Sequence, residues 1–143
     1  MNKGRSILLA EDSLNDVELI VSALSTEMVV SKVVVVNDGV EALDYLTYKG
    51  KYQQREPENP ALILLDVKMP RMDGIEALQQ IRKLNSLRLI PVVMLTSSRE
   101  ESDLKTSYAF GANAYVVKPV AYDEFLKAVK QIGTFWISKN SLS

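Results

Sequence analysis

The length of 143 residues fits one domain, and 47% hydrophobic with 24% charged residues is typical of a globular rather than a disordered protein. The 17 Lys and Arg residues nearly balance 18 Asp and Glu residues, so the chain lacks the basic excess of a nucleic-acid-binding protein, and we expect no nucleic acid partner. The absence of Cys and His excludes disulfides, thiolate or imidazole metal ligands, and a Ser-His-Asp triad.

The apolar runs near the start of the chain are short. Ile7–Ala10 ends at Glu11, and Val33–Val36 is equally short. A signal peptide needs an apolar run of about 7 to 15 residues, and a membrane-spanning helix needs about 20. We therefore expect no membrane association and a cytoplasmic location.

Five short segments rich in Val, Ile and Leu are predicted strands. They show almost no alternation of polar and apolar residues, which is typical of strands buried on both faces of a parallel sheet. In chain order they are Ser6–Ala10, Val33–Val36, Ala61–Leu65, Ile90–Leu95 and Ala114–Val117.

Amphipathic helices are predicted between the strands and after the last one. Helical spacing of apolar residues is clearest at Val17, Ile20, Val21 and Leu24, and again at Phe125, Val129, Ile132 and Trp136. An acidic residue follows three positions after each of four predicted N-caps, Ser13, Asp38, Asp73 and Ser98. Gly111 is a predicted helix stop. The alternation predicts an α/β fold, a (βα)5 doubly wound five-stranded parallel sheet.

The segment 48–60 interrupts this regular alternation. It is polar, contains two prolines and exceeds the usual connection of about 2 to 6 residues between a helix and a strand. It is either a surface loop that extends the second helix or a contact specific to a partner. The tail 138–143 is polar, and we expect one domain with a core of about 4–137.

Charged and polar residues follow four of the five predicted strands. Glu11 and Asp12 follow the first, Asp66 the third, Thr96 the fourth and Lys118 the fifth. Ligands of open α/β sheets bind beyond the carboxyl ends of the strands, so these side chains are expected to meet at one edge.

Crowded carboxylates raise one another's pKa, and a divalent cation relieves their repulsion. An all-oxygen set suits Mg²⁺, which could neutralise phosphoryl oxygens while Asp66 accepts the group. Lys118 and the hydroxyl of Thr96 could bind further phosphoryl oxygens. The residues therefore predict Mg²⁺-assisted phosphoryl transfer to Asp66.

At these residues the chain resembles a response-regulator receiver domain of two-component signalling. The matching segments occur in order at the predicted strand ends, and they are LLAED (8–12), LILLDVKMPRMDG (62–74), VVMLTSS (92–98) and GANAYVVKP (111–119). With the helices between them the resemblance spans about residues 4–137, and it implies a flavodoxin-like fold.

The resemblance implies a role for each matching residue. Asp66 would accept the phosphoryl group from a phosphohistidine of a partner histidine kinase. Asp12 would bind Mg²⁺ (or Mn²⁺) directly, Glu11 through water, and Lys68 through its backbone carbonyl, with Asp66 as a further ligand. Lys118 would bind the phosphoryl group. The family assists its own phosphorylation and dephosphorylation but turns over no separate substrate, so we do not expect an enzyme.

The resemblance also implies a conformational switch. Thr96 would move toward the phosphoryl group and Tyr115 would turn inward behind it, which reshapes the surface of the fourth helix, fifth strand and fifth helix. Pro70 and Gly74 would shape the loop after the phosphoacceptor. No residues are left for an output domain, so we expect a stand-alone receiver that signals through altered contacts with a downstream protein.

The segment 48–60 and the pair Phe135 and Trp136 most resemble the small regulators paired with bacterial phytochrome-type histidine kinases. That resemblance implies a phytochrome-type kinase partner and a possible homodimer, to which the aromatic pair could contribute an anchor.

Two other classes of protein compete with a phosphorylatable receiver. The first class is an enzyme. Phosphatases with an Asp nucleophile usually carry a second Asp two positions later, where this chain has Lys68. A nucleotide-binding protein would carry one of two glycine-rich motifs, and the chain has neither. A pseudo-receiver that binds partners without phosphorylation stays open as the alternative, although a pure scaffold has no need of crowded carboxylates.

Overall fold

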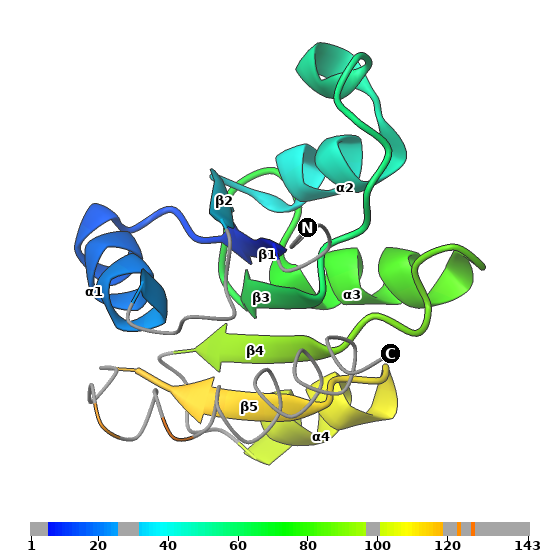
Figure 1. Cartoon of the computed structure of the whole chain (residues 1–143). Coiled ribbons are helices and arrows are strands. Elements are labelled where there is room, and N and C mark those ends of the chain that lie inside the picture. Colours follow the sequence, from blue (N-terminus) through cyan, green and yellow to red (C-terminus); the bar gives the residue numbers. More distant parts are fainter. Residues whose placement is uncertain (1–5, 26–31, 97–100, 119–122, 124–126, 128–143) are drawn as a thin grey trace, which may run out of the picture.

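The computed structural model describes residues 6–25, 32–96, 101–118, 123 and 127. Five strands form one all-parallel sheet in the order β2-β1-β3-β4-β5 (Figure 1). The strands are β1 (Ser6–Ala10), β2 (Lys32–Val36), β3 (Leu62–Asp66), β4 (Val92–Thr96) and β5 (Ala114–Val117). This order confirms the predicted flavodoxin-like, doubly wound sheet.

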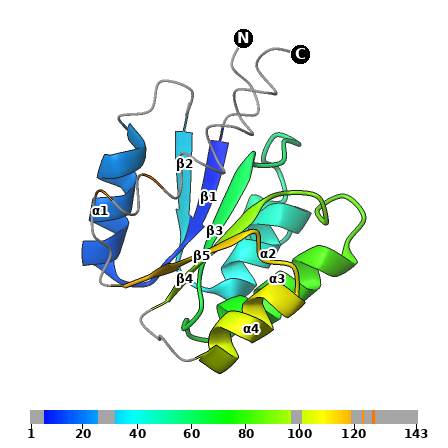
Figure 2. The same ribbon diagram turned by 90° about the horizontal axis from the view of Figure 1, so that it is seen from below.

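Helices cover both faces of the sheet. They are α1 (Leu14–Ser25), α2 (Gly39–Thr47), α3 (Gly74–Lys83) and α4 (Glu101–Ala109), with a 3-10 turn, η1 (Gly50–Tyr52), after α2. Helix α1 lies on one face, and α2, α3 and α4 lie on the other (Figure 2). Asp123 and Lys127 are helical, and the rest of the predicted last helix, with Phe135 and Trp136, lies outside the described residues. Among those residues, no helix combines the length and hydropathy needed to cross a bilayer.

The unbroken apolar character of the strands follows from burial on both faces. In β1, Ile7 and Leu9 pack in the cluster that contains α1, whereas Leu8 and Ala10 pack in the cluster that contains α2 and α3. Successive strand residues point to opposite faces, so each face needs its own apolar set. Full burial of a Leu or Ile contributes about 1.5–3 kcal/mol, which makes these two layers the main stabilisation of the sheet.

Two predicted strands are shifted along the chain. The third ends at Asp66 rather than Leu65, because Asp66 continues the ladder opposite Leu95. The fourth begins at Val92 rather than Ile90, because Ile90 donates its N–H to the carbonyl of Leu87 in a turn. The strand also ends at Thr96, so Asp66 and Thr96 are the last residues of their strands and not the first residues beyond them.

The predicted caps are confirmed where the structure describes them. Asp38 accepts a hydrogen bond from the N–H of Glu41 at 2.8 Å, and Asp73 accepts one from Glu76 at 2.9 Å. The Ser13 hydroxyl lies 3.4 Å from the N–H of Asp16. Gly111 follows α4 with φ +99°, the left-handed conformation that a helix stop requires. Ser98 lies outside the described residues.

The segment 48–60 is a loop anchored to α2. The Arg55 guanidinium stacks on the rings of Tyr45 and Tyr48, at 3.9 and 4.1 Å from their centroids, and its Nε donates to the Tyr45 carbonyl at 2.6 Å. The hydroxyl of Tyr52 donates to Glu41 at 2.7 Å. Burial and this hydrogen bond raise the pKa of Tyr52, so the phenol stays protonated.

Tyr52→Phe is expected to lower the free energy of unfolding by about 1 kcal/mol, because it removes a hydrogen bond to a partly buried carboxylate. Urea denaturation of the purified chain measures the change. Tyr48→Phe is the matched control, since it keeps the ring that stacks on Arg55, and no hydrogen bond of its hydroxyl occurs among the described residues. Equal stability of Tyr52→Phe and the wild type would show that this hydrogen bond does not anchor the loop.

Candidate phosphoacceptor site

The candidate site lies where the strand order reverses. Strands β1 and β3 are neighbours at the centre of the sheet, and their connections leave on opposite faces. This switch point is where open α/β sheets bind ligands, beyond the carboxyl ends of the strands. The sequence places Glu11 and Asp12 directly after β1 and Asp66 at the end of β3.

Three carboxylates meet there as predicted. One oxygen each from Glu11, Asp12 and Asp66 lies within 4.8 Å of the others. Glu11 is 0% exposed and Asp66 is 5% exposed, whereas Asp12 faces solvent. Oxygen ligands with one open side suit Mg²⁺, which keeps several waters in protein sites. The donor set therefore fits a divalent cation.

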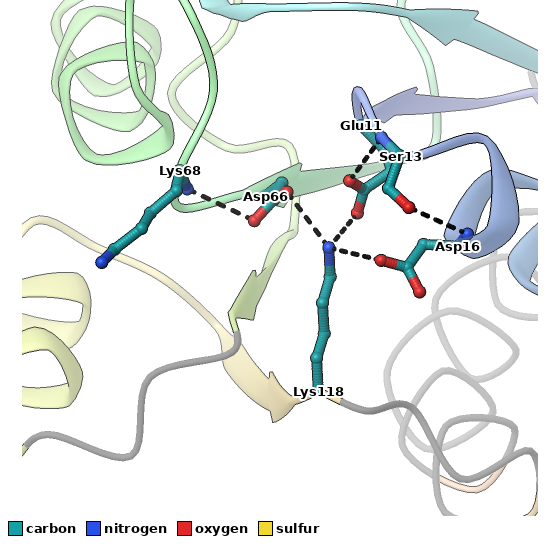
Figure 3. Close-up of polar contacts among 6 residues, drawn as sticks. All are labelled: Glu11, Ser13, Asp16, Asp66, Lys68 and Lys118. Carbon is teal, nitrogen blue, oxygen red and sulfur yellow. Dashed lines mark hydrogen bonds and ion pairs between the residues drawn. The ribbon is translucent and has the colours of Figure 1, made fainter.

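Lys118 supplies the positive charge of the site. It follows β5, and its ammonium contacts carboxylates from three different segments (Figure 3). It donates to Glu11 Oε1, lies 2.9 Å from Asp16 Oδ2 and lies 3.1 Å from Asp66 Oδ2. Its side chain is 11% exposed, so water screens these contacts little.

The pKa values of Glu11 and Lys118 reflect the burial of both side chains and their contact with each other. Desolvation, reinforced by the neighbouring Asp66, raises the pKa of Glu11 to about 7, although the hydrogen bond from Lys118 opposes this change. Burial lowers the pKa of Lys118, but the hydrogen bonds to Glu11 and Asp16 and the charge of Asp66 outweigh it and raise the pKa overall. Lys118 is therefore a firmly protonated ammonium at neutral pH.

The loop after β3 is held close to Asp66. The N–H of Lys68 donates to Asp66 Oδ1 at 3.3 Å, and the N–H of Gly74 donates to the Val67 carbonyl at 2.8 Å. The side chain of Lys68 points away from Asp66 (Figure 3). A Cβ on Gly74 would lie 2.2 Å from the Asp66 carbonyl oxygen, so only glycine permits this approach.

A second ion pair connects the loop after β3 to the N-terminus of α2. Arg71 has φ +64° and makes two hydrogen bonds to the carboxylate of Asp38, at 2.9 and 3.1 Å. The N–H of Gly39 also donates to the Met72 carbonyl at 3.0 Å. The N-cap of α2 therefore positions the loop that follows Asp66.

The two residues predicted to switch lie on β4 and β5. Thr96 is fully buried at the end of β4. Tyr115 is half-buried on β5, packs against the cluster that contains α2 and α3, and has its ring 6.4 Å from that of Tyr108 on α4. The structure thus gathers Glu11, Asp12, Asp66, Thr96 and Lys118 at one edge of the sheet.

The sequence analysis missed Asp16 and the Arg71–Asp38 pair as parts of this site. The position of Asp16 three residues after Ser13 predicts only a role in capping, and Asp38 is predicted only as an N-cap. A signal for Asp16 exists, because it lies in the first turn of the helix that begins two residues after Asp12. No spacing in the sequence connects Arg71 with Asp38, which lies 33 residues earlier.

The sequence profile of the response regulator receiver domain matches residues 7–130. The chain belongs to the response regulator receiver domain family. Receiver domains are phosphoacceptors of signalling pathways, bind divalent metal and interact with histidine kinases. The acidic cluster and Lys118 are thus the charged centre of a receiver domain.

Small regulators are among the relatives of this receiver domain. Response regulator Rcp1 of Synechocystis sp. is 36% identical over 141 residues, which cover 99% of this chain and 95% of Rcp1. The solved bacteriophytochrome response regulator RtBRR is 52% identical with a TM-score of 0.80, over 90% of this chain and 77% of that one. The phosphorylated cyanobacterial phytochrome response regulator RcpA is 40% identical with a TM-score of 0.82, over 94% of both chains.

Proposed function

We propose that this chain is a single-domain response regulator that accepts a phosphoryl group on Asp66 from a partner histidine kinase in a Mg²⁺-dependent reaction. The observation that carries the proposal is the contact of one largely buried ammonium, that of Lys118, with Asp66 and Glu11 inside a carboxylate cluster. Two acidic groups beside the acceptor fit a divalent cation, and the ammonium fits a phosphoryl oxygen.

In the proposed reaction an oxygen of Asp66 forms a bond to phosphorus while the bond from phosphorus to the donor nitrogen breaks. The imidazole of the donor leaves and takes up a proton from solvent. Glu11, Asp12, Asp66 and the carbonyl of Lys68 would hold the metal, which supplies charge neutralisation for the phosphoryl oxygens. Lys118 binds one phosphoryl oxygen and the Thr96 hydroxyl another.

The output is proposed to be a change of protein–protein contacts. Movement of Thr96 toward the phosphoryl group leaves space behind it, and Tyr115 turns inward to fill that space. Both residues lie on neighbouring strands, where Thr96 pairs with Val117 two positions after Tyr115. This register supports a direct mechanical connection between the two side chains.

We further propose that the kinase is of the phytochrome type and that the chain forms a homodimer. RcpA and RtBRR are described as phytochrome and bacteriophytochrome response regulators, and Rcp1 has been solved with Mn²⁺ bound. The match to Rcp1 over nearly its whole length supports the same role for one receiver domain spanning about residues 4–137. Trp136→Ala, with sedimentation velocity, tests the contribution of that residue to a dimer.

The function is tested by intact-mass analysis after incubation with a small phosphodonor such as acetyl phosphate. Wild type is expected to gain one phosphoryl group with Mg²⁺ and none without it, and Asp66→Asn is expected to gain none. Asp73→Asn is the matched control, because Asp73 is an N-cap carboxylate of the adjoining helix outside the cluster. An equal gain in Asp66→Asn, or no gain in wild type, would favour the pseudo-receiver that binds partners without phosphorylation.

A further inference from the structure

The ammonium of Lys118 contacts as many carboxylates as it has N–H donors. A lysine ammonium carries three N–H groups, and three carboxylates contact this one, from Glu11, Asp16 and Asp66. A phosphoryl group on Asp66 brings new oxygens that need a cationic donor. The contact with Asp66 can pass to an oxygen of that group, and any further phosphoryl contact competes with Glu11 and Asp16 for the ammonium.

The three carboxylates differ in how easily they can be released. Glu11 is fully buried, so no water can replace the ammonium there, and only a bound cation could compensate its charge. Asp66 bears the phosphoryl group itself. The side chain of Asp16 is 27% exposed, so water can replace the ammonium there. Asp16 is the contact that can be released at the lowest cost.

Ser13 holds Asp16 in place beside the site. The N–H of Ser13 donates to Glu11 Oε2 at 3.1 Å, and its hydroxyl lies 3.4 Å from the N–H of Asp16. Lys118 contacts both Glu11 and Asp16. Together with the two interactions of Ser13, these contacts form a closed ring through the four residues (Figure 3). The start of α1 is thereby connected to the end of β5.

We propose that Asp16 is a positioning residue that holds the Lys118 ammonium against α1 and competes with the phosphoryl group for it. This inference rests on the proposed phosphorylation of Asp66. Asp16 is not one of the three residues whose oxygens converge within 4.8 Å, and the group that it contacts is the Lys118 ammonium. Loss of its charge frees the ammonium for the phosphoryl group.

The test compares phosphorylation rates with acetyl phosphate at saturating Mg²⁺. Asp16→Asn is expected to react about threefold faster than wild type, the size expected for release of one partly exposed ion pair. Glu18→Gln is the matched control, because Glu18 is an exposed residue of the same helix and the substitution makes the same change in net charge. Asp16→Glu keeps the negative charge and is expected to react at a rate close to that of wild type.

A second comparison separates action through Lys118 from a general charge effect. In a Lys118→Met background, Asp16→Asn is expected to leave the residual rate unchanged, because the group through which it acts is absent. Equal acceleration in that background, or in Glu18→Gln, would overturn the inference, as would equal rates for Asp16→Asn and wild type. Those results leave phosphorylation of Asp66 standing, whereas a wild type that gains no phosphoryl group contradicts the proposed function itself.

Discussion

Lys118→Met is expected to lower the free energy of unfolding by about 3 kcal/mol without Mg²⁺, since removal of one partner from a buried ion pair leaves an uncompensated charge. The substitution keeps an unbranched side chain of similar length but removes the ammonium that neutralises Glu11 and Asp66. Uptake of a proton by Glu11, whose pKa is already raised to about 7, keeps the loss from being larger. Chemical denaturation at pH 7.5 measures the difference.

Mg²⁺ is expected to reduce the loss in Lys118→Met, because a divalent cation among the carboxylates takes over the neutralisation of their charge. The stability of the variant should therefore rise more with added Mg²⁺ than that of wild type. Lys68→Met is the matched control, since Lys68 is exposed and points away from Asp66. If both variants were equally stable, the ammonium of Lys118 would not be compensating the buried carboxylates.

Gly74→Ala is expected to lower the free energy of unfolding by about 3 kcal/mol and to slow phosphorylation of Asp66. A methyl group at this position would lie 2.2 Å from the carbonyl oxygen and 2.9 Å from the carbonyl carbon of Asp66. Both atoms belong to the backbone at the end of β3, so no side chain can move aside. The strand end or the start of α3 must shift, and Asp66 moves with it.

Gly50→Ala separates this steric effect from the ordinary cost of replacing glycine. Gly50 has φ +58°, and its nearest neighbour to an added Cβ is the flexible carboxylate of Asp44 at 3.2 Å. Its substitution is expected to cost only about 1 kcal/mol, the strain of the left-handed conformation, with an unchanged phosphorylation rate. Equal effects of the two substitutions would show that the approach of Gly74 to Asp66 is unimportant.

Most of the fold could be predicted because its signals are local. Unbroken apolar runs such as Ile7–Ala10 indicate strands buried on both faces, and the pattern at Ile20 and Leu24 predicts the buried side of α1, where both are fully buried. Strand ends were less accurate, since Asp66 and Thr96 belong to strands only through their pairing with Leu95 and Val117. Such pairing depends on the neighbouring strand and leaves no local signal.

The members of the site could also be predicted, because parallel strands bring their carboxyl ends to one edge of the sheet. Residue type and position along the chain were enough to predict a shared site for five residues, Glu11, Asp12, Asp66, Thr96 and Lys118. Their chemistry also follows from residue type, since crowded oxygens favour a divalent cation and an ammonium favours a phosphoryl oxygen.

The strands, the helix caps and the set of charged groups at one sheet edge all follow from the order of the amino acids. Which of these groups touch one another follows from the packing of distant elements. Lys118 meets Glu11 across 107 residues of chain, and Arg71 meets Asp38 across 33. Asp16 enters the site because α1 packs on its own face of the sheet, which turns a capping residue toward the ammonium. Propensity and periodicity act over a few neighbouring residues, whereas these contacts depend on how distant elements pack.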